Sequence, residues 1–262
     1  MQEEQLSGGN MSEVVRVDDT VRRSTGLWTP TIQRLLEHVR RRGVGWVPKP
    51  LGYDEQGREV LSFIPGDVPH AMPDWVWSDD VLIDVGRALR QLHDATSDFD
   101  ARGSVWNSPA REPLEVICHN DFAPYNCVFE QGRWVGAIDF DFCAPGPRVW
   151  DLAYTAYRFV PLMPPQAADV ADGRQERSPF GEEEGAARLE AFLGAYTQGD
   201  VALGCTAAAV VSAAVGRLRD IAVWTAAHVA STGDRRLEDH ARMYRAHAAW
   251  LAELPGRFGD AT

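Results

Sequence analysis

The sequence predicts an α+β protein with a small antiparallel sheet near the N-terminus and a mainly helical remainder. Short apolar runs bounded by turn residues indicate strands over 13–17, 20–23 and 59–64. Thr29-Pro30 has the pattern of a helix start, with threonine as cap and proline at the first helical position, and the helical pattern ends near Gly43. One helix should therefore pack on the small sheet.

The remainder of the chain has mostly helical spacing. Ser78 is a plausible cap for a helix that runs through Leu92, and residues 185–254 continue the helical pattern with breaks around Gly199 and Gly233. Between them, residues 164–185 are rich in proline, glycine and acids. This acidic segment is either a solvated loop or a lid or acidic wall near a substrate.

The composition and net charge of the chain favour some classes of partner and disfavour others. The chain has 262 residues, 45% of them hydrophobic and 24% charged, as is typical of a globular protein. Its formal net charge of -12 disfavours a nucleic-acid partner, because binding a polyanion depends on clustered cations. An acidic chain suits a cationic ligand, although many proteins are acidic only to stay dispersed.

Two further features predict a cytoplasmic protein without a membrane partner. The four cysteines show no CxxC spacing, and the first fifteen residues lack a basic start followed by an apolar stretch. The most apolar span, 201–230, is interrupted by Arg217, Arg219 and Asp220. We therefore expect a buried amphipathic helix there rather than a membrane crossing.

The segment 116–154 carries the chemistry. Two apolar runs, 127–130 and 133–138, are separated by Gln131-Gly132, which indicates a tight hairpin. A two-residue loop pairs Glu130 with Arg133 and Cys127 with Gly136. Asn126 then falls opposite Ala137 and diagonal to Asp139, about 7–8 Å away at the backbone.

That spacing lets the amide of Asn126 and the carboxylate of Asp139 converge on one hard divalent cation, and Mg²⁺ takes such oxygen ligands. Asp121 lies on the approach loop, where it could accept a hydrogen bond from an attacking hydroxyl. Each residue also has a plainer interpretation: Asn126 as a turn or cap residue, and Asp139 with Asp141 as solvated carboxylates at a strand end.

The pattern His119-x-Asp121-x-x-x-x-Asn126, followed by a hairpin that ends in Ile138-Asp139-Phe140, resembles the catalytic loop and metal-binding segment of the aminoglycoside phosphotransferase family, relatives of protein kinases. The resemblance implies a bilobal protein-kinase-like fold, with an N-terminal nucleotide-binding lobe and hinge over 1–66 and a catalytic and substrate-binding lobe over 67–262. It also implies Mg²⁺, ATP or GTP as phosphate donor, and a small-molecule hydroxyl acceptor, for example a cationic one such as an aminoglycoside.

Carried over by position, the resemblance makes Asp121 the catalytic aspartate, Asn126 and Asp139 the Mg²⁺ ligands, and His119 a scaffold residue. Asp151 matches an aspartate that braces the catalytic loop, and a helix N-terminal cap is an equal alternative for it.

In the N-terminal part the resemblance is weaker. Gly8-Gly9-Asn10 is similar to a glycine-bearing loop over the phosphates, and Ser62, Phe63 and Ile64 are similar to the hinge that meets the nucleotide base. The family's phosphate-binding lysine is missing, because the only lysine of the chain is Lys49.

An arginine on the matching strand, Arg23 rather than Arg22, would take the role of that lysine, although its planar fork differs from an ammonium. The lysine's usual helix glutamate is replaced by Thr31 or Ile32 in the alignment. Either arginine and an altered partner form a variant clamp, or this lobe has drifted and binds nucleotide poorly.

Three rival interpretations remain open on the sequence. A non-catalytic or degenerate nucleotide-binding protein would explain the missing lysine and glutamate. A metal-dependent hydrolase would use Asp121 and Asp139 with His119 as a ligand. A zinc site would draw on Cys118, His119, Cys127 and Cys143, although these residues lack paired-ligand spacing.

Overall fold

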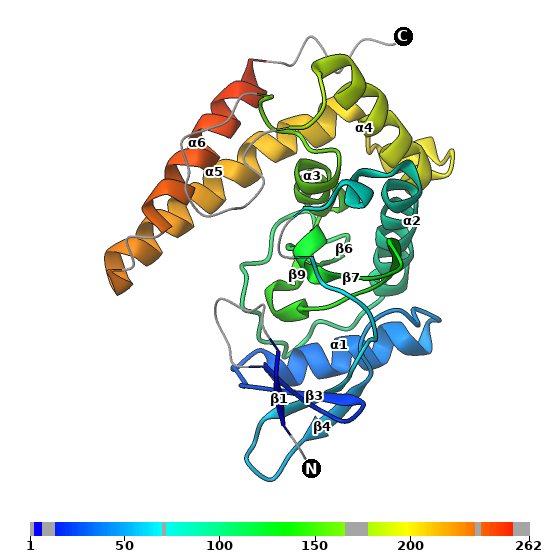
Figure 1. Ribbon diagram of the computed structural model, residues 1–262, viewed down its shortest axis with the longest axis vertical. Coiled ribbons are helices and arrows are strands. Elements are labelled where there is room, and N and C mark those ends of the chain that lie inside the picture. The colour runs from blue at the N-terminus through cyan, green and yellow to red at the C-terminus, as the bar shows by residue number, and fades with distance from the viewer. Residues whose placement is uncertain (1–2, 7–13, 70–71, 166–177, 234–236, 254–262) are drawn as a thin grey trace. The chain divides into compact units, whose positions relative to one another are not determined.

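The computed structural model describes residues 3–6, 14–69, 72–165, 178–233 and 237–253 (Figure 1). The chain forms two compact units. The first comprises Met1–His70 with Leu89–Arg148, and the second comprises Ala71–Ala88 with Val149–Thr262. The predicted site residues lie in the first unit, apart from Asp151, which lies in the second.

The first unit contains the antiparallel sheet that the sequence predicts. Its five strands have the order β1-β2-β3-β5-β4, and all neighbours are antiparallel. The strands are β1 (Glu4–Gln5), β2 (Val14–Val17), β3 (Thr20–Arg23), β4 (Pro50–Tyr53) and β5 (Glu59–Ser62). The expected strands are confirmed, except that β5 ends at Ser62 and Glu13 lies outside the described residues. β1 and β4 were not predicted.

Helix α1 (Thr29–Arg41) runs alongside this sheet (Figure 1). Its apolar face, formed by Ile32, Leu35, Leu36 and Val39, is buried, as spacing of three and four residues requires. The predicted cap is off by one residue. Trp28 occupies the N-cap position, and the Thr29 hydroxyl accepts a hydrogen bond from the Gly26 N–H at 2.9 Å.

Two short antiparallel pairs complete the first unit. β6 (Val116–Cys118) pairs with β9 (Ala144–Gly146), and β7 (Cys127–Glu130) pairs with β8 (Arg133–Ala137). β6 and β9 were not predicted, since three residues are too few to show a period.

The β7–β8 hairpin corrects the predicted register. Glu130 pairs with Arg133 as expected, but Cys127 pairs with Ala137 and not with Gly136. The ladder shifts between Val128 and Phe129 because Val135 is an extra residue in β8, which is a β-bulge. Asn126 consequently lies opposite Ile138, whose N–H donates to the Asn126 carbonyl at 2.9 Å.

The second unit is helical. Helix α2 (Asp79–Thr96) contributes to both units, and the other helices are α3 (Arg148–Phe159), α4 (Glu182–Thr197), α5 (Ala207–Thr232) and α6 (Glu238–Ala252). α5 and α6 lie side by side (Figure 1). The breaks expected at Gly199 and Gly233 are confirmed, and both glycines have positive φ values.

The acidic segment of 164–185 is only partly described. Its three consecutive glutamates, Glu182 to Glu184, form the first turn of α4, where negative side chains are favourable at the positive end of the helix dipole. Residues 166–177 lie outside the described residues, so the choice between a loop and a lid stays a prediction.

Helix α5 packs less completely than the sequence indicates. Positions such as Val210, Leu218 and Ala222 are buried, while Val223 and Trp224 are exposed. Within the described residues, the stretch Val201–Thr232 is long and apolar enough to cross a membrane by length and composition, and 28% of its most apolar window is buried. This single helix is weak evidence for a membrane span, because core helices pass the same test.

Candidate active site

Three hydrogen bonds hold the loop after β6 against the segment after β8. His119 is fully buried, and its Nε2 lies 3.2 Å from the Ile138 carbonyl. Its Nδ1 accepts the Asp121 N–H at 3.3 Å, so Nε2 carries the proton and donates to Ile138. Asn120 Nδ2 donates to the Phe142 carbonyl at 2.9 Å, and the Ile138 N–H donates to Asn126.

Packing of buried aromatic rings also supports the loop that carries His119 and Asp121. Phe122 is fully buried, and its ring lies edge-on to Trp46 and to His119, with centroids 6.1 and 5.3 Å apart. The His119 ring also packs against Phe140 at 4.6 Å. His119 therefore has the surroundings of a scaffold residue, and both of its ring nitrogens already have protein partners.

Asp121 is held by the two residues that precede β7. The Tyr125 hydroxyl donates to Asp121 Oδ1 at 2.7 Å, and Asn126 Nδ2 donates to Oδ2 at 2.8 Å. Asn126 Nδ2 also lies 3.0 Å from the Asp121 carbonyl. Each carboxylate oxygen is thus oriented by a separate side chain, which fixes the plane of the Asp121 carboxylate.

Asp139 occupies the turn that follows β8. Its backbone is left-handed, with φ of 62° and ψ of 64°, a conformation that non-glycine residues seldom adopt and that clusters at functional sites. Burial and the neighbouring Asp141 carboxylate raise the pKa of Asp139, while Arg23 opposes this effect.

The donor atoms at this place fit a magnesium ion. The amide nitrogen of Asn126 is committed to Asp121, which leaves its amide oxygen as the atom to offer to a cation. Asp139 supplies a carboxylate, and its electrostatic surroundings resist a negative charge that a cation would compensate. One carboxylate with one amide oxygen matches the few protein ligands that Mg²⁺ typically takes.

A buried cluster of charges lies beside Asp139. Arg23 on β3 donates through Nε to Glu59 on β5, through Nη2 to Asp141 at 2.5 Å, and through Nη1 to Asp139 at 3.4 Å. Burial lowers the pKa of Arg23, but Asp141, Glu59 and Asp139 together raise it above the ordinary value. The guanidinium therefore stays positively charged at the edge of the site.

Arg22 and Arg23 face opposite sides of the sheet, since successive strand residues alternate. Arg22 donates to the Thr20 hydroxyl at 2.5 Å and pairs with Asp54 at 3.7 Å. The structure thus brings Arg23 to Asp139 and does not bring Arg22 there.

The predicted hinge residues follow directly from β5. The Ser62 N–H donates to the Lys49 carbonyl at 2.9 Å, and the Phe63 N–H donates to the Asp19 carbonyl at 2.8 Å. These two donors are already used within the protein, so contact with a nucleotide base would fall to other backbone groups, including those of Ile64.

The other predicted positions add less. Gly8-Gly9-Asn10 lies outside the described residues. Asp151 is fully buried in the first turn of α3, and its supporting role stays a prediction. The four cysteines are buried and form no disulfide, and burial raises the pKa of Cys127 to about 12, which disfavours it as a metal ligand.

Sequence reasoning missed five contributors to this site: Gln33, Glu59, Asn120, Tyr125 and Asp141. One of them had a signal, because Asp141 shares the Asp-x-Asp spacing with Asp139. The contacts of the other four depend on tertiary packing.

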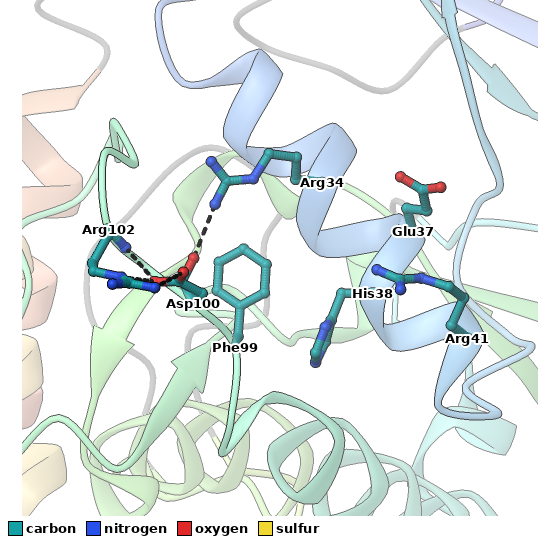
Figure 2. Close-up of a pocket in the computed structure, with 7 residues that line it drawn as sticks. All are labelled: Arg34, Glu37, His38, Arg41, Phe99, Asp100 and Arg102. Carbon is teal, nitrogen blue, oxygen red and sulfur yellow. Dashed lines mark hydrogen bonds and ion pairs between the residues drawn. The ribbon is translucent and has the colours of Figure 1, made fainter.

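A separate hollow of about 320 Å³ lies between α1 and the segment after α2 (Figure 2). In this view Asp100 receives hydrogen bonds from Arg34 and Arg102, and Phe99 lies between Arg34 and His38. The lining residues are Arg34, Glu37, His38, Arg41, Phe99, Asp100 and Arg102. None belongs to the cluster around Asp121, so this hollow is not the candidate active site.

The sheet, its helix, and the helical second unit define a protein-kinase-like fold, and solved structures confirm it. A choline/ethanolamine kinase family protein from Mesorhizobium loti superposes with a TM-score of 0.65 at 18% identity, over 97% of this chain and 88% of that one. The streptomycin-ATP-APH(2'')-IIa ternary complex superposes with a TM-score of 0.52 at 15% identity, over 93% of each chain. At such identities the likeness shows the fold alone.

Sequence comparison finds a family match for the middle of the chain. Residues 98–196, which contain the loop with Asp121 and the turn with Asp139, match the phosphotransferase enzyme family. The segment that carries the predicted catalytic loop is therefore similar to that family, which agrees with the resemblance seen in the sequence.

A curated relative is the trifolitoxin immunity protein of Rhizobium leguminosarum bv. trifolii, 37% identical over 147 residues. The match covers 53% of this chain and 55% of the relative, so it spans about half the length of each.

Proposed function

We propose that this protein is a small-molecule kinase that transfers the terminal phosphate of ATP or GTP to a hydroxyl group. The observation that carries the proposal is the convergence around Asp121. Its carboxylate is oriented by Tyr125 and Asn126, and the Ile138 N–H bond to Asn126 ties the same loop to the turn that bears Asp139. The family match and the kinase-like fold support the same reaction class.

In this mechanism Asp121 accepts a hydrogen bond from the acceptor hydroxyl and orients its oxygen for in-line attack. Arg23 contacts the nucleotide phosphates and offsets the charge that develops on them. Asn126 and Asp139 would hold Mg²⁺, which supplies charge neutralisation of the triphosphate when bound. His119 keeps the loop in place by its two hydrogen bonds.

The rival functions are less well supported. A hydrolase that uses His119 as a metal ligand would need a ring nitrogen, and both ring nitrogens are hydrogen-bonded to the backbone. A degenerate nucleotide-binding protein was suggested by the missing lysine and glutamate. Arg23 and its buried partner Glu59 supply a charged substitute for that pair, which favours an active enzyme.

For the acceptor, we propose a chemical class rather than a single molecule. The net charge of -12 suits a cationic hydroxylated molecule such as an amino sugar or an amino alcohol. The curated relative's name favours a second candidate function, immunity to a toxin. The two candidates coincide if the toxin carries the acceptor hydroxyl. The four cysteines, which form no disulfide, support a reducing, cytoplasmic location as part of this proposal.

The test is a panel of acceptors incubated with ATP or GTP and Mg²⁺, in which product mass is followed by mass spectrometry. Aminoglycosides, amino alcohols and trifolitoxin form its three arms. An acceptor that gains one phosphate supports the proposal and names the class. If the protein binds nucleotide but phosphorylates no member and protects cells from a toxin, immunity by binding is the better account. Absence of nucleotide binding contradicts the kinase proposal.

A further inference from the structure

Glu59 lies at the centre of a buried chain of polar contacts. It is fully buried at the start of β5, directly opposite Arg23 in the register of β3 and β5. One carboxylate oxygen, Oε2, accepts from Arg23 Nε, and the other, Oε1, accepts from Gln33 Nε2 at 2.7 Å. A carboxylate this deep in the protein requires such partners, because an unpaired buried charge is very costly.

Gln33 links this carboxylate to helix α1. Its own amide orientation is fixed, because Oε1 lies 3.3 Å from the Gly52 N–H and a backbone N–H can only donate. Nε2 is then the atom that faces Glu59. Helix α1 therefore contributes a neutral side chain to the Arg23–Glu59 pair, next to Thr31 and Ile32, where the family resemblance implies a glutamate.

The nitrogens of the Arg23 guanidinium have two kinds of partner. Nε is held by Glu59, while Nη1 and Nη2 point to Asp139 and Asp141. The Nη1 contact to Asp139 is long, at 3.4 Å. This end of the fork faces the predicted metal ligand and is the part that can turn to a phosphate. A lysine has a single nitrogen and could not divide its donors along such a fork.

We infer that Glu59, assisted by Gln33, is the positioning residue that holds Arg23 for contact with the nucleotide phosphates. Glu59 thereby replaces, from the neighbouring strand, the helix glutamate that this chain lacks. The inference rests on the proposed function. It adds a positioning residue to that proposal, since the family resemblance placed only Thr31 or Ile32 at the position of the helix glutamate.

The experiment compares a ligand that carries the phosphates with one that lacks them. The dissociation constants of Mg²⁺-ATP and of adenosine are measured by calorimetry for the wild type and for Glu59→Gln; GTP and guanosine replace them if the wild type prefers guanine. Glu55→Gln is the matched control, because Glu55 is exposed in the turn before β5 and has no part in the site. Thermal unfolding of each variant is recorded in parallel.

We expect Glu59→Gln to weaken ATP binding about tenfold, the loss of one charge-assisted hydrogen bond, and to leave adenosine binding within about twofold. Glu55→Gln should match the wild type for both ligands. An equal loss of ATP and adenosine binding would overturn the inference, because it would show a merely structural role. Unchanged ATP binding in folded Glu59→Gln would overturn it as well.

If Glu59→Gln does not fold, a second variant, Gln33→Leu, tests the same inference. That variant removes one contact of Glu59 on a helix that tolerates leucine, and should weaken ATP binding about threefold with adenosine unaffected. No change in ATP binding would overturn the inference. A wild type that binds neither nucleotide nor nucleoside would overturn the proposed function together with it, whereas the results above concern Glu59 alone.

Discussion

Arg23 and Glu59 face each other across adjacent antiparallel strands, and the arginine Nε donates to the glutamate Oε2 in the buried interior of the first unit. The pair joins two facts that the sequence left unconnected, an arginine in place of the family's lysine and Thr31 or Ile32 at the position of the family's helix glutamate. Glu59 on β5 and Arg23 on β3 form an ion pair between two strands, in place of the pair between a strand lysine and a helix glutamate that the family resemblance implies.

Replacement of Arg23 should be more harmful than replacement of Arg22. We expect Arg23→Ala to reduce kcat/KM for ATP by about a hundredfold, the usual effect of removing one charged donor from a transferring phosphate. Arg22→Ala should lose no more than about threefold, because Arg22 pairs with Asp54 and Thr20 on the other face. Steady-state kinetics with varied ATP measures both, and a larger loss in Arg22→Ala would contradict the assignment.

Tyr125 gives a second test, because its hydroxyl donates to the candidate catalytic carboxylate. Tyr125→Phe keeps the ring and removes one hydrogen bond to a partly exposed charged group. We expect a loss of about fivefold in kcat, corresponding to roughly 1 kcal/mol, with little change in KM for ATP. An increase in kcat would instead mean that the phenol competes with the acceptor for Asp121.

His38 should make stability depend on pH. Burial lowers its pKa, and the nearby charges of Arg42 and Arg41 add to this, while the hydrogen bond from Nε2 to the Ala95 carbonyl opposes it. Asp98 lies 3.4 Å from Nε2 but does not reverse the direction.

Because the folded pKa is depressed, the folded state binds fewer protons than the unfolded state just below the ordinary histidine pKa of about 6.5. His38 therefore makes its full contribution to the free energy of unfolding above that pH. The contribution is lost as the pH falls through the pKa that His38 has in the folded state. Urea unfolding at pH 7.5 and 5.5 should show a smaller pH dependence in His38→Gln than in the wild type. The same pH dependence in His38→Gln and in the wild type would contradict this assignment.

The sequence predicted those parts of the fold and site that depend on local pattern. The three expected strands, the helix over α1 and the hairpin turn at Gln131-Gly132 follow from turn residues and apolar spacing, and the loop from His119 to Asn126 follows from a motif. The hairpin register could not be predicted, because the extra residue Val135 has no compositional mark and shifts every later pairing by one.

Tertiary partners were also beyond local pattern. Glu59 and Gln33 are separated by 26 residues, and only the packing of α1 on the sheet brings them together. Tyr125 precedes Asn126 in the motif, but nothing in the sequence shows that its hydroxyl turns back to Asp121.

The most direct test of the central claim compares phosphate transfer by the wild type, by Asp121→Asn, and by Asp100→Asn, a matched change at an exposed surface aspartate. The acceptor is the one that the panel identifies, and nucleotide affinity is measured beside the transfer rate. The account predicts that Asp121→Asn loses at least about a hundredfold in transfer at nearly unchanged nucleotide affinity, while Asp100→Asn keeps both. Transfer at the wild-type rate by Asp121→Asn would contradict it.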